Sequence, residues 1–253
     1  MKTTFNIKIH ILYYLFAILS IMTGLFKEFI LFNSLIVIHE IGHALMALFL
    51  GWKIEKIVLF PFGGLTIFKN SLDKPILEEF IILISGPAIQ LIFYFLIQSI
   101  SYSETLMIYN WGILIFNLLP IYPLDGSKMI NLILLKYLPF IKSNLITLYF
   151  SLLVLLFAII GIIRFGFNLL ITITLLFLLI KIFKELKTIN YTFNYFLLEK
   201  IRYNRYYKKK RVINGNKINK IYRDSSHLFF FNNKYHLEKE ILRKRFDFIS
   251  KVW

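Results

Sequence analysis

Long and nearly uninterrupted apolar stretches most constrain how this chain can fold. An α-helix needs about 20 mostly apolar residues to cross the hydrocarbon core of a bilayer. Six stretches are expected to do so, at roughly residues 9–25, 29–50, 75–100, 106–119, 145–163 and 165–183. The composition agrees, because 58% of the residues are apolar and 17% are charged, against roughly 25% charged residues in soluble proteins. We therefore expect an all-α polytopic membrane protein, and we exclude a water-soluble monomer and a disordered chain.

Basic residues predict the orientation of these spans. One side of the membrane receives the basic loops and both termini, whereas the other side receives only Lys27 and Arg164. Because loops rich in Lys and Arg stay in the cytoplasm, we expect cytoplasmic termini. Lys2 and Lys8 precede the first stretch as in a signal peptide, but no small-x-small cleavage site follows. We therefore expect this stretch to remain as a span.

Most of the net charge lies in the last part of the chain. The whole chain carries +16, and from Lys181 to Trp253 there are 19 Lys and Arg against 6 Asp and Glu, which is 13 of those 16 charges. We expect a six-span domain over residues 1–185 and a basic cytoplasmic tail over residues 186–253, with no direct nucleic-acid binding. The run Lys208–Arg211 can engage an acidic substrate or anionic lipid. A solvated positive flank is the reading we favour.

The tail offers few other local signals. It has some amphipathic character near 237–249 and a turn signal at Asn214-Gly215-Asn216. Three histidines elsewhere have no His or carboxylate partner at the spacing of a metal site, and we expect ordinary interfacial or surface side chains for them: His10, His227 and His236.

Two segments do not follow the pattern of a plain helix. Trp52–Phe68 alternates in part, which favours a hairpin or a re-entrant loop beside the membrane. Such a segment can present a substrate strand or be only an amphipathic membrane hairpin. Asn117–Gly126 contains two prolines and ends on a glycine, so it breaks the fourth span. Irregular backbone at membrane depth survives only within protein or beside a watery cavity, so this break is expected at a site. The centre of the first segment is Phe60-Pro61-Phe62-Gly63-Gly64.

The sequence His39-Glu40-Ile41-Gly42-His43, in the middle of the second expected span, has the H-E-x-x-H pattern. Residues four apart on an α-helix lie about 40° around the axis and about 6 Å along it, so both imidazoles can bind one metal ion. Glu40 can hold a metal-bound water and take its proton. Gly42 is expected to keep the metal side of the helix uncrowded. Since ionisable groups inside an apolar span are costly, a site is favoured over a merely satisfied polar cluster.

Two histidines leave a catalytic zinc ion one ligand short, because such sites usually take three protein ligands and water. The chain has no cysteine, so the third ligand must be another histidine or a carboxylate. Asp125 is our candidate, because the fourth span can return to pack on the second. The alternative is a turn aspartate that merely precedes a glycine. We expect one zinc ion held by His39, His43 and Asp125.

These motifs together resemble the site-2 protease family of intramembrane zinc metalloproteases. The H-E-I-G-H motif in a span is followed by N-L-L-P-x-x-P-L-D-G, and Ser85-Gly86-Pro87 is similar to a further element of the family. The resemblance covers about residues 9–185. Short extracytoplasmic turns, no inserted PDZ module and a tail are similar to the sporulation branch, which releases pro-sigma-K in endospore-forming bacteria. The segment Phe60–Leu65 is similar to the membrane re-entrant element of that branch.

The resemblance implies roles for individual residues. Glu40 would act as general base and acid beside the zinc ion. Asn117 with the Pro120 and Pro123 loop would position substrate or stabilise the oxyanion, although Asn117 can also be a locally satisfied helix cap. Two positions depart from the family pattern, and neither is expected to touch the metal ligands: Gln90, where Asn is frequent, and Ser127, where a second glycine is frequent.

The resemblance also implies partners and a location. They are a proprotein substrate such as pro-sigma-K, membrane lipid, inhibitory membrane partners of a sporulation complex, and the membrane around the forespore, facing the mother cell cytoplasm. A homo-oligomer stays open. Close relatives end in a nucleotide-sensing CBS domain, and residues 186–253 are short for one. A degenerate CBS-like region that binds ATP is therefore an option that no motif supports.

Two other functions are compatible with the same residues. One is the same chemistry on a membrane-anchored anti-sigma factor or another substrate. The other is a non-catalytic zinc-binding membrane scaffold or transporter, which would spread polar residues along several spans. Because the intramembrane charge is concentrated at one place, we favour the enzyme.

Overall fold

The structure is a computed structural model, and it describes residues 6–60, 63–100, 103–165, 169–203 and 205–250. The chain forms two compact units, each described here by itself. The first unit contains Met1–Ser71, Leu77–Leu119 and Leu124–Gly126, and the second contains Leu72–Ile76, Pro120–Pro123 and Ser127–Trp253.

Each of the six expected spans coincides with a helix. The helices are α1 (Ile11–Met22), α2 (Phe26–Phe49), α3 (Ile76–Ile100), α4 (Glu104–Leu118), α6 (Phe140–Phe165) and α7 (Leu169–Arg202). Within the described residues, three stretches are long and apolar enough to cross a membrane: Phe26–Phe49, Ile76–Ser99 and Phe140–Gly161. Helices α1 and α4 have 12 and 15 residues, fewer than the roughly 20 that a perpendicular span needs. Membrane embedding is supported, and a total of six spans stays a prediction.

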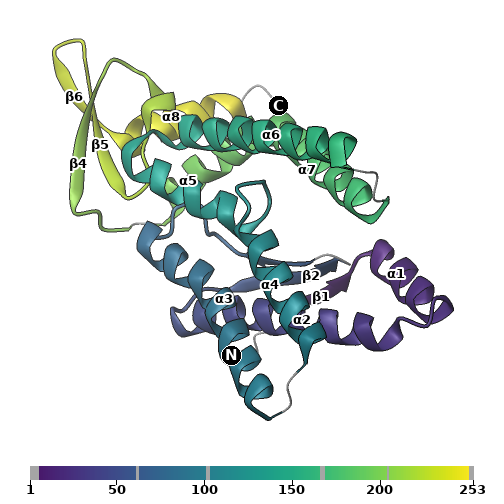
Figure 1. The fold of residues 1–253 in the computed structure, drawn as a ribbon. Helices are drawn as coiled ribbons and strands as arrows, with labels where there is room; N and C mark the ends of the chain where they lie inside the picture. The colour runs from purple at the N-terminus through teal and green to yellow at the C-terminus, as the bar shows by residue number, and fades with distance from the viewer. Residues whose placement is uncertain (1–5, 61–62, 101–102, 166–168, 204, 251–253) are drawn as a thin grey trace. The chain divides into compact units, whose positions relative to one another are not determined.

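A three-stranded sheet belongs to the first unit. Its strands are β1 (Asn6–Ile9), β2 (Ile54–Phe60) and β3 (Gly63–Phe68), in the order β1-β2-β3. Strand β2 pairs in parallel with β1 and antiparallel with β3, so the hairpin, one of the two forms expected for Trp52–Phe68, is present. Strand β1 was not expected, because its residues precede the first apolar stretch. Helix α2 packs against β2 and β3 (Figure 1).

The core of the first unit lies along α2. On one side, Leu35 and Ile36 pack with Tyr94 of α3 and with Leu106 and Ile113 of α4. These side chains are buried although α2, α3 and α4 also expose many large apolar side chains. A helix that is apolar on all sides is typical of a membrane environment, where lipid covers the outer faces.

Trp52 joins three elements at the end of α2. Its ring packs edge-on against Phe68 of β3, with ring centroids 5.5 Å apart. Its indole N–H donates to Glu78 Oε2 of α3 at 2.7 Å. Ala47 of α2 and Ile82 of α3 complete the cluster. Trp52 therefore ties the hairpin to both helices.

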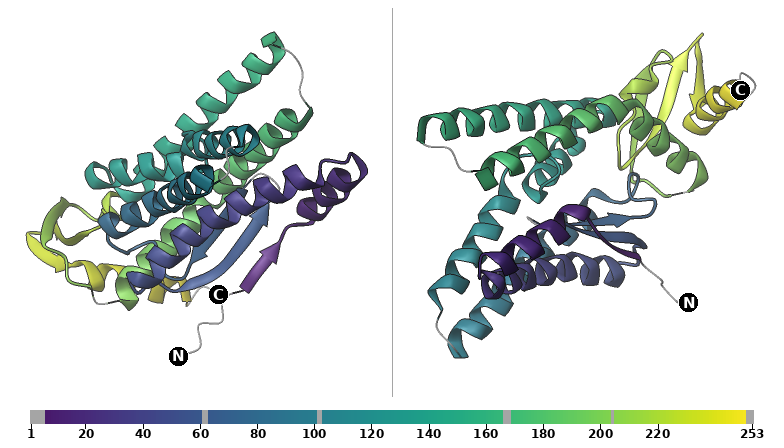
Figure 2. Two further views of the ribbon diagram at one scale, coloured as in Figure 1. Left: turned by 60° about the horizontal axis from the view of Figure 1, so that its bottom comes forward. Right: turned by 90° about the vertical axis from the view of Figure 1, so that its right-hand side faces the viewer.

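The second unit contains α5 (Asp125–Tyr137) from its third residue on, α6 and α7. Helices α6 and α7 lie side by side, and the start of α6 and the end of α7 lie near the tail (Figure 2). Phe140 at the start of α6 stacks on Phe196 of α7 with centroids 4.0 Å apart. Helix α5 is not predicted by the sequence; it lies between the fourth and fifth expected spans, 106–119 and 145–163.

The tail folds as a small sheet and a helix. Strand β5 (Ser225–Phe231) pairs in parallel with β4 (Lys209–Asn214) and antiparallel with β6 (Lys234–Leu237). The short 3₁₀ helix η1 is Ile218–Lys220, and α8 (Glu238–Ser250) occupies the amphipathic stretch and packs on β5 and β6. A turn follows β4 at Gly215, whose φ of +78° suits glycine.

His227 corrects one expectation. It is not a surface side chain, since it is 2% exposed. Its Nδ1 lies 3.0 Å from Glu238 Oε2 at the start of α8, and its Nε2 accepts the Tyr222 N–H at 3.1 Å. Burial, opposed by the hydrogen bond that Nδ1–H donates to Glu238, lowers the pKa of His227. The partner is eleven residues away along the chain, so local spacing could not indicate it.

We predict that Trp52→Ala destabilises the first unit by about 3–5 kcal/mol, as expected when a buried aromatic side chain is removed. The matched control is Trp111→Ala on α4, because the Trp111 side chain is 46% exposed. Heating the detergent-solubilised protein and measuring the monodisperse fraction by size-exclusion chromatography would compare them. Equal losses in both variants would contradict the role of Trp52.

Candidate metal centre

Helix α2 places two imidazoles together in the interior of the first unit. His39 and His43 are 1% and 5% exposed, and their ring centroids are 4.8 Å apart. Their separation of one helical turn puts both on one face. They meet the side chain of Asp125, the first residue of α5.

The three side chains converge on one point. Asp125 Oδ2 lies 3.1 Å from His39 Nε2 and 3.1 Å from His43 Nε2. Within the described residues these three form the group of His and acidic side chains that could hold a metal ion, with ligand atoms all within 4.8 Å of one another. Zinc–nitrogen bonds of about 2.0–2.1 Å at tetrahedral angles place neighbouring ligand atoms about 3.3 Å apart. The two distances from Asp125 Oδ2 to the imidazole nitrogens therefore fit zinc.

A backbone carbonyl determines which nitrogen of His43 carries the proton. His43 Nδ1 lies 2.7 Å from the carbonyl oxygen of Ile82 in α3. Because a carbonyl oxygen can only accept a hydrogen bond, Nδ1–H must donate. In the neutral imidazole, Nε2 then presents its lone pair toward Asp125.

The side chain of Gln90, itself held by Asn110, determines which nitrogen of His39 carries the proton. Gln90 Nε2 donates to the carbonyl oxygen of Asn110 at 3.2 Å and to Asn110 Oδ1 at 3.0 Å. This orients Gln90 Oε1 toward His39 Nδ1, at 2.8 Å. His39 Nδ1–H therefore donates, and its Nε2 lone pair also faces Asp125.

Gln90 corrects an expectation. It was expected not to touch the metal ligands, yet it is fully buried and holds His39 directly. Sequence reasoning missed this role because 51 residues separate the partners. The available signal was the amide side chain at the position where the family often has Asn.

The arrangement has a chemical consequence. Two imidazole lone pairs face a carboxylate oxygen, so three electron-rich atoms meet with no proton between them when both rings are neutral. A divalent cation held by these residues would relieve this repulsion by accepting the three lone pairs. The outer hydrogen bonds of both rings are those that fix metal-binding histidines in known sites.

Glu40 lies beside this group and contacts the hairpin. Its Oε2 accepts a hydrogen bond from Thr66 Oγ1 of β3 at 2.7 Å. A Cβ atom at position 64 would lie 2.2 Å from Glu40 Cγ, so Gly64 leaves the space that this side chain occupies. The hairpin thus shapes the surroundings of the Glu40 carboxylate.

Further glycines allow backbones to approach the site. A Cβ on Gly86 would lie 2.4 Å from the His43 ring, and one on Gly126 would lie 2.1 Å from the Leu118 oxygen. Gly42 faces the α3 backbone, since a Cβ there would lie 2.6 Å from the Ser85 oxygen. Its role is therefore close packing with α3, where Ser85 Oγ also donates to the Gly42 oxygen at 3.0 Å. This packing differs from the prediction that Gly42 keeps the metal side of the helix uncrowded.

The other expected site residues are placed as follows. Asn117 is half-buried in the last turn of α4. Pro120 and Pro123 belong to the second unit, and the Tyr122–Pro123 peptide bond is cis. Phe60 ends β2 with its ring 5.0 Å from that of His10, and Gly63 begins β3. Pro61 and Phe62 lie outside the described residues. The roles suggested for these residues stay predictions.

Fold and site together define a metallopeptidase that works within a membrane, because two of the three candidate ligands, His39 and His43, lie on an apolar helix long enough to span one. The comparisons agree. The family model "Peptidase family M50" matches residues 28–104. Stage IV sporulation protein FB of Bacillus subtilis is 34% identical over 82% of this chain and 74% of its own length. The chain belongs to the site-2 proteases of peptidase family M50, and it is a zinc metalloprotease.

Two further matches extend the comparison to an archaeon. Zinc metalloprotease MJ0392 of Methanocaldococcus jannaschii is 33% identical over 54% of this chain and 45% of its own length. The solved structure of a site-2 protease from the same organism matches with a TM-score of 0.56 and 30% identity, over 71% of this chain and 89% of that one.

We predict that Gln90→Leu lowers zinc affinity by about 10- to 100-fold, the usual cost of removing the partner of a metal-binding histidine. Gln98→Leu is the matched control, since Gln98 lies on the same helix, two turns further on. Competition with a chelator measures affinity directly, without any substrate. Unchanged affinity in Gln90→Leu would contradict the orienting role.

Proposed function

We propose that this chain is an intramembrane endopeptidase in which His39, His43 and Asp125 hold the zinc ion and Glu40 moves the proton. The observation that carries the assignment is the convergence of two imidazole lone pairs on the Asp125 carboxylate. The described hydrogen bonds of His39 and His43 support it, because they leave both Nε2 atoms to a metal.

The chemistry follows from the groups present. When bound there, zinc lets a water ionise near neutral pH and polarises the peptide carbonyl. Glu40 takes the proton from the attacking water as the carbon–oxygen bond forms. It then gives that proton to the amide nitrogen as the carbon–nitrogen bond breaks. The Thr66 hydroxyl holds Oε2, and we assign proton transfer to Oε1.

We predict that Glu40→Gln lowers the cleavage rate by at least about 10²-fold, the usual contribution of a general base, while zinc stays bound. Glu55→Gln is a suitable control, because Glu55 is an exposed carboxylate on β2. Cleavage of a co-expressed pro-sigma-K-like substrate is measured with bound zinc in the same preparations. Undiminished cleavage by Glu40→Gln would refute this mechanism.

For the substrate we propose a membrane-associated proprotein, pro-sigma-K during sporulation. The support is the likeness to a sporulation protein of B. subtilis over most of the chain. We also propose that the protein lies in the membrane around the forespore with both termini in the cytoplasm. Its domains would then be a six-span domain over residues 1–185 and a tail over residues 186–253. Co-expression with pro-sigma-K and with a membrane-anchored anti-sigma factor separates the two substrates. Cleavage of the anti-sigma factor alone would overturn the assignment.

We further propose that β3 receives the substrate as an added strand. Strand β3 is an edge of its sheet, whereas β2 is the central strand. Lys69 N–H donates to the Lys53 oxygen at 2.8 Å. Since amides alternate along an antiparallel strand, the N–H groups of Gly64 and Thr66 then point away from β2. These residues also contact Glu40, so an added strand would run beside the proton-transferring group.

We predict that Thr66→Pro abolishes cleavage and retains zinc, because it removes an outward-pointing edge N–H while the hairpin pairing stays. Thr66→Val is the matched control: it loses the same hydroxyl and keeps the N–H, so it should cleave at a reduced rate. Substrate cleavage and zinc content are measured for both. Equal activity of the two variants would show that the edge amide is not used.

A further inference from the structure

A five-residue connection between the hairpin and α3 belongs to the second unit. Along the chain, Leu72–Ile76 follows β3 and leads into α3, yet it clusters with the tail. Strand β3 carries Thr66, which holds Glu40, and α3 carries Ile82 and Gln90, which hold the two imidazoles. This connection therefore joins two elements that each contact the metal centre.

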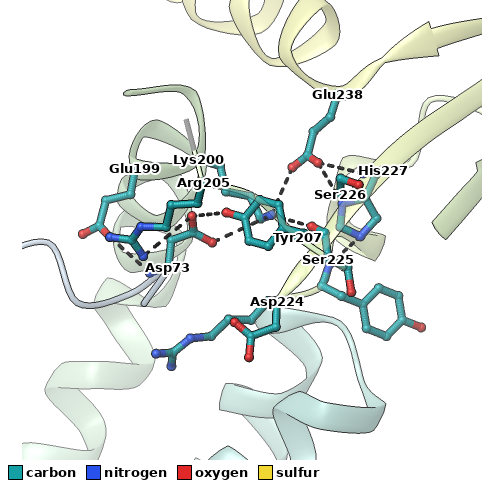
Figure 3. Close-up of polar contacts among 12 residues, drawn as sticks. Asp73, Glu199, Lys200, Arg205, Tyr207, Asp224, Ser225, Ser226, His227 and Glu238 are labelled. Carbon is teal, nitrogen blue, oxygen red and sulfur yellow. Dashed lines mark hydrogen bonds and ion pairs between the residues drawn. The ribbon is translucent and has the colours of Figure 1, made fainter. Parts of the chain in front are cut away.

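Asp73, at the centre of the connection, is surrounded by groups of α7 and the tail. Its side chain is fully buried. Its N–H donates to Glu199 Oε2 at 3.1 Å, and the Tyr207 hydroxyl donates to its Oδ2. Lys200 Nζ lies 3.8 Å from Oδ1, and Arg205 Nη1 lies 4.0 Å from Oδ2. Figure 3 shows these side chains pointing toward Asp73.

Lys200 connects Asp73 to the tail sheet and helix. Its side chain is 2% exposed, and Nζ donates to the Ser225 oxygen of β5 at 2.8 Å. The same ammonium lies 3.4 Å from Glu238 Oε1 of α8 and 4.2 Å from the centre of the Tyr207 ring (Figure 3). A buried ammonium needs such partners, and here two carboxylates from different segments supply them.

Two further residues of the tail hold the rest of the connection. Arg223 Nε donates to the Lys74 oxygen at 2.7 Å. Asp224 Oδ2 accepts the N–H of Ile76, the first residue of α3, at 2.9 Å. A carboxylate at this place accepts a hydrogen bond from an N–H group at the helix N-terminus, and its negative charge interacts favourably with the helix dipole. Asp224 has a φ of +53°, which few residues other than Gly, Asn and Asp adopt.

Asp73 and Glu199 are both buried. Burial raises the pKa of Asp73, against the opposing effect of Lys200 and Tyr207. Burial also raises the pKa of Glu199, against the hydrogen bond from the Asp73 N–H. Contacts between charges in such surroundings are screened little by water and salt.

We propose that the tail is a positioning element for the peptidase site, acting through a clamp on the connection Leu72–Ile76. The clamp residues are Glu199, Lys200, Arg205, Tyr207, Arg223 and Asp224. They position the start of α3, and through it the oxygens that orient His39 and His43. The inference rests on the zinc ligands assigned above, and it adds that the tail is required for the site to take its working geometry.

The experiment uses the full chain in detergent and compares variants that remove a clamp contact with a variant that conserves one. Lys200→Met leaves Asp73 and Glu238 without their shared cation, and Asp224→Ala removes the acceptor at Ile76. We expect amide hydrogen exchange in 72–76 to become at least about 10-fold faster in both, since each loses a charge-assisted contact. Asp224→Asn keeps an acceptor oxygen and should restore most of the protection.

A second measurement reads out the metal centre without a substrate. Zinc affinity, from chelator competition, is expected to fall up to about 10-fold in Lys200→Met and Asp224→Ala, as orientation of the metal-binding histidines weakens. Cleavage should fall with it. Tyr207→Phe should show a smaller effect of the same kind. Its matched control is the neighbouring Tyr206→Phe, since Tyr206 is 91% exposed.

The outcomes are distinguishable. Unchanged exchange in 72–76 would show that the clamp does not hold the connection. Faster exchange with unchanged zinc affinity and cleavage would overturn the positioning role. Exchange in β5 and β6 shows whether a variant has simply unfolded the tail, in which case Tyr207→Phe and the Asp224 pair decide. If the wild type cuts no substrate offered, the substrate assignment fails, while exchange and zinc affinity still decide this inference.

Discussion

The whole site depends on two backbone carbonyl oxygens that can only accept hydrogen bonds. The Ile82 oxygen makes His43 Nδ1 a donor, and the Asn110 oxygen orients Gln90 so that His39 Nδ1 is a donor too. Because Nδ1 of each ring is a donor, Nε2 of each ring offers its lone pair to a metal ion. These are fixed features of the backbone, so the site has its protonation pattern before any ligand arrives. Such preorganisation matters within a membrane, where unsatisfied polar groups are costly.

That requirement explains where the chain needs glycine. For the Ile82 oxygen to reach His43, α3 must approach α2 very closely. At this distance there is no space for a Cβ atom at position 42 or 86, so both residues are glycine. Gly64 does the same for the Glu40 side chain. The glycines and the polar contacts therefore depend on each other. Short hydrogen bonds to the ring nitrogens require the helix backbones to be in contact, and that contact requires residues without side chains.

Sequence reasoning predicts best what is local. The H-E-x-x-H pattern needs only helix geometry, so His39, Glu40 and His43 could be placed on one helix without the fold. Asp125 could be inferred because zinc lacks a third ligand, and the structure brings it to 3.1 Å from both rings. The hairpin was visible from alternation and from its Pro-Gly centre.

The remaining features depend on contacts between distant parts of the chain. Gln90 is not predicted to contact the ligands because 51 residues separate it from His39 along the chain. Strand β1 has only four residues, and it is stabilised by pairing with β2 rather than by a pattern of its own. The burial of His227 likewise depends on Glu238, which only the packing of α8 on β5 brings near.

The charge of the tail shows why composition alone misleads. We read the basic surplus as a solvated flank, and the exposed run Lys208–Lys210 is compatible with that. Lys200, from the same surplus, is buried between Asp73 and Glu238. A buried ammonium that loses one of two carboxylates is left with an uncompensated charge. The contact works in both directions: the tail holds the connection Leu72–Ile76, and Asp73 of that connection helps to hold the tail. On this proposal, a movement of Lys200 changes the position of the residues at the start of α3.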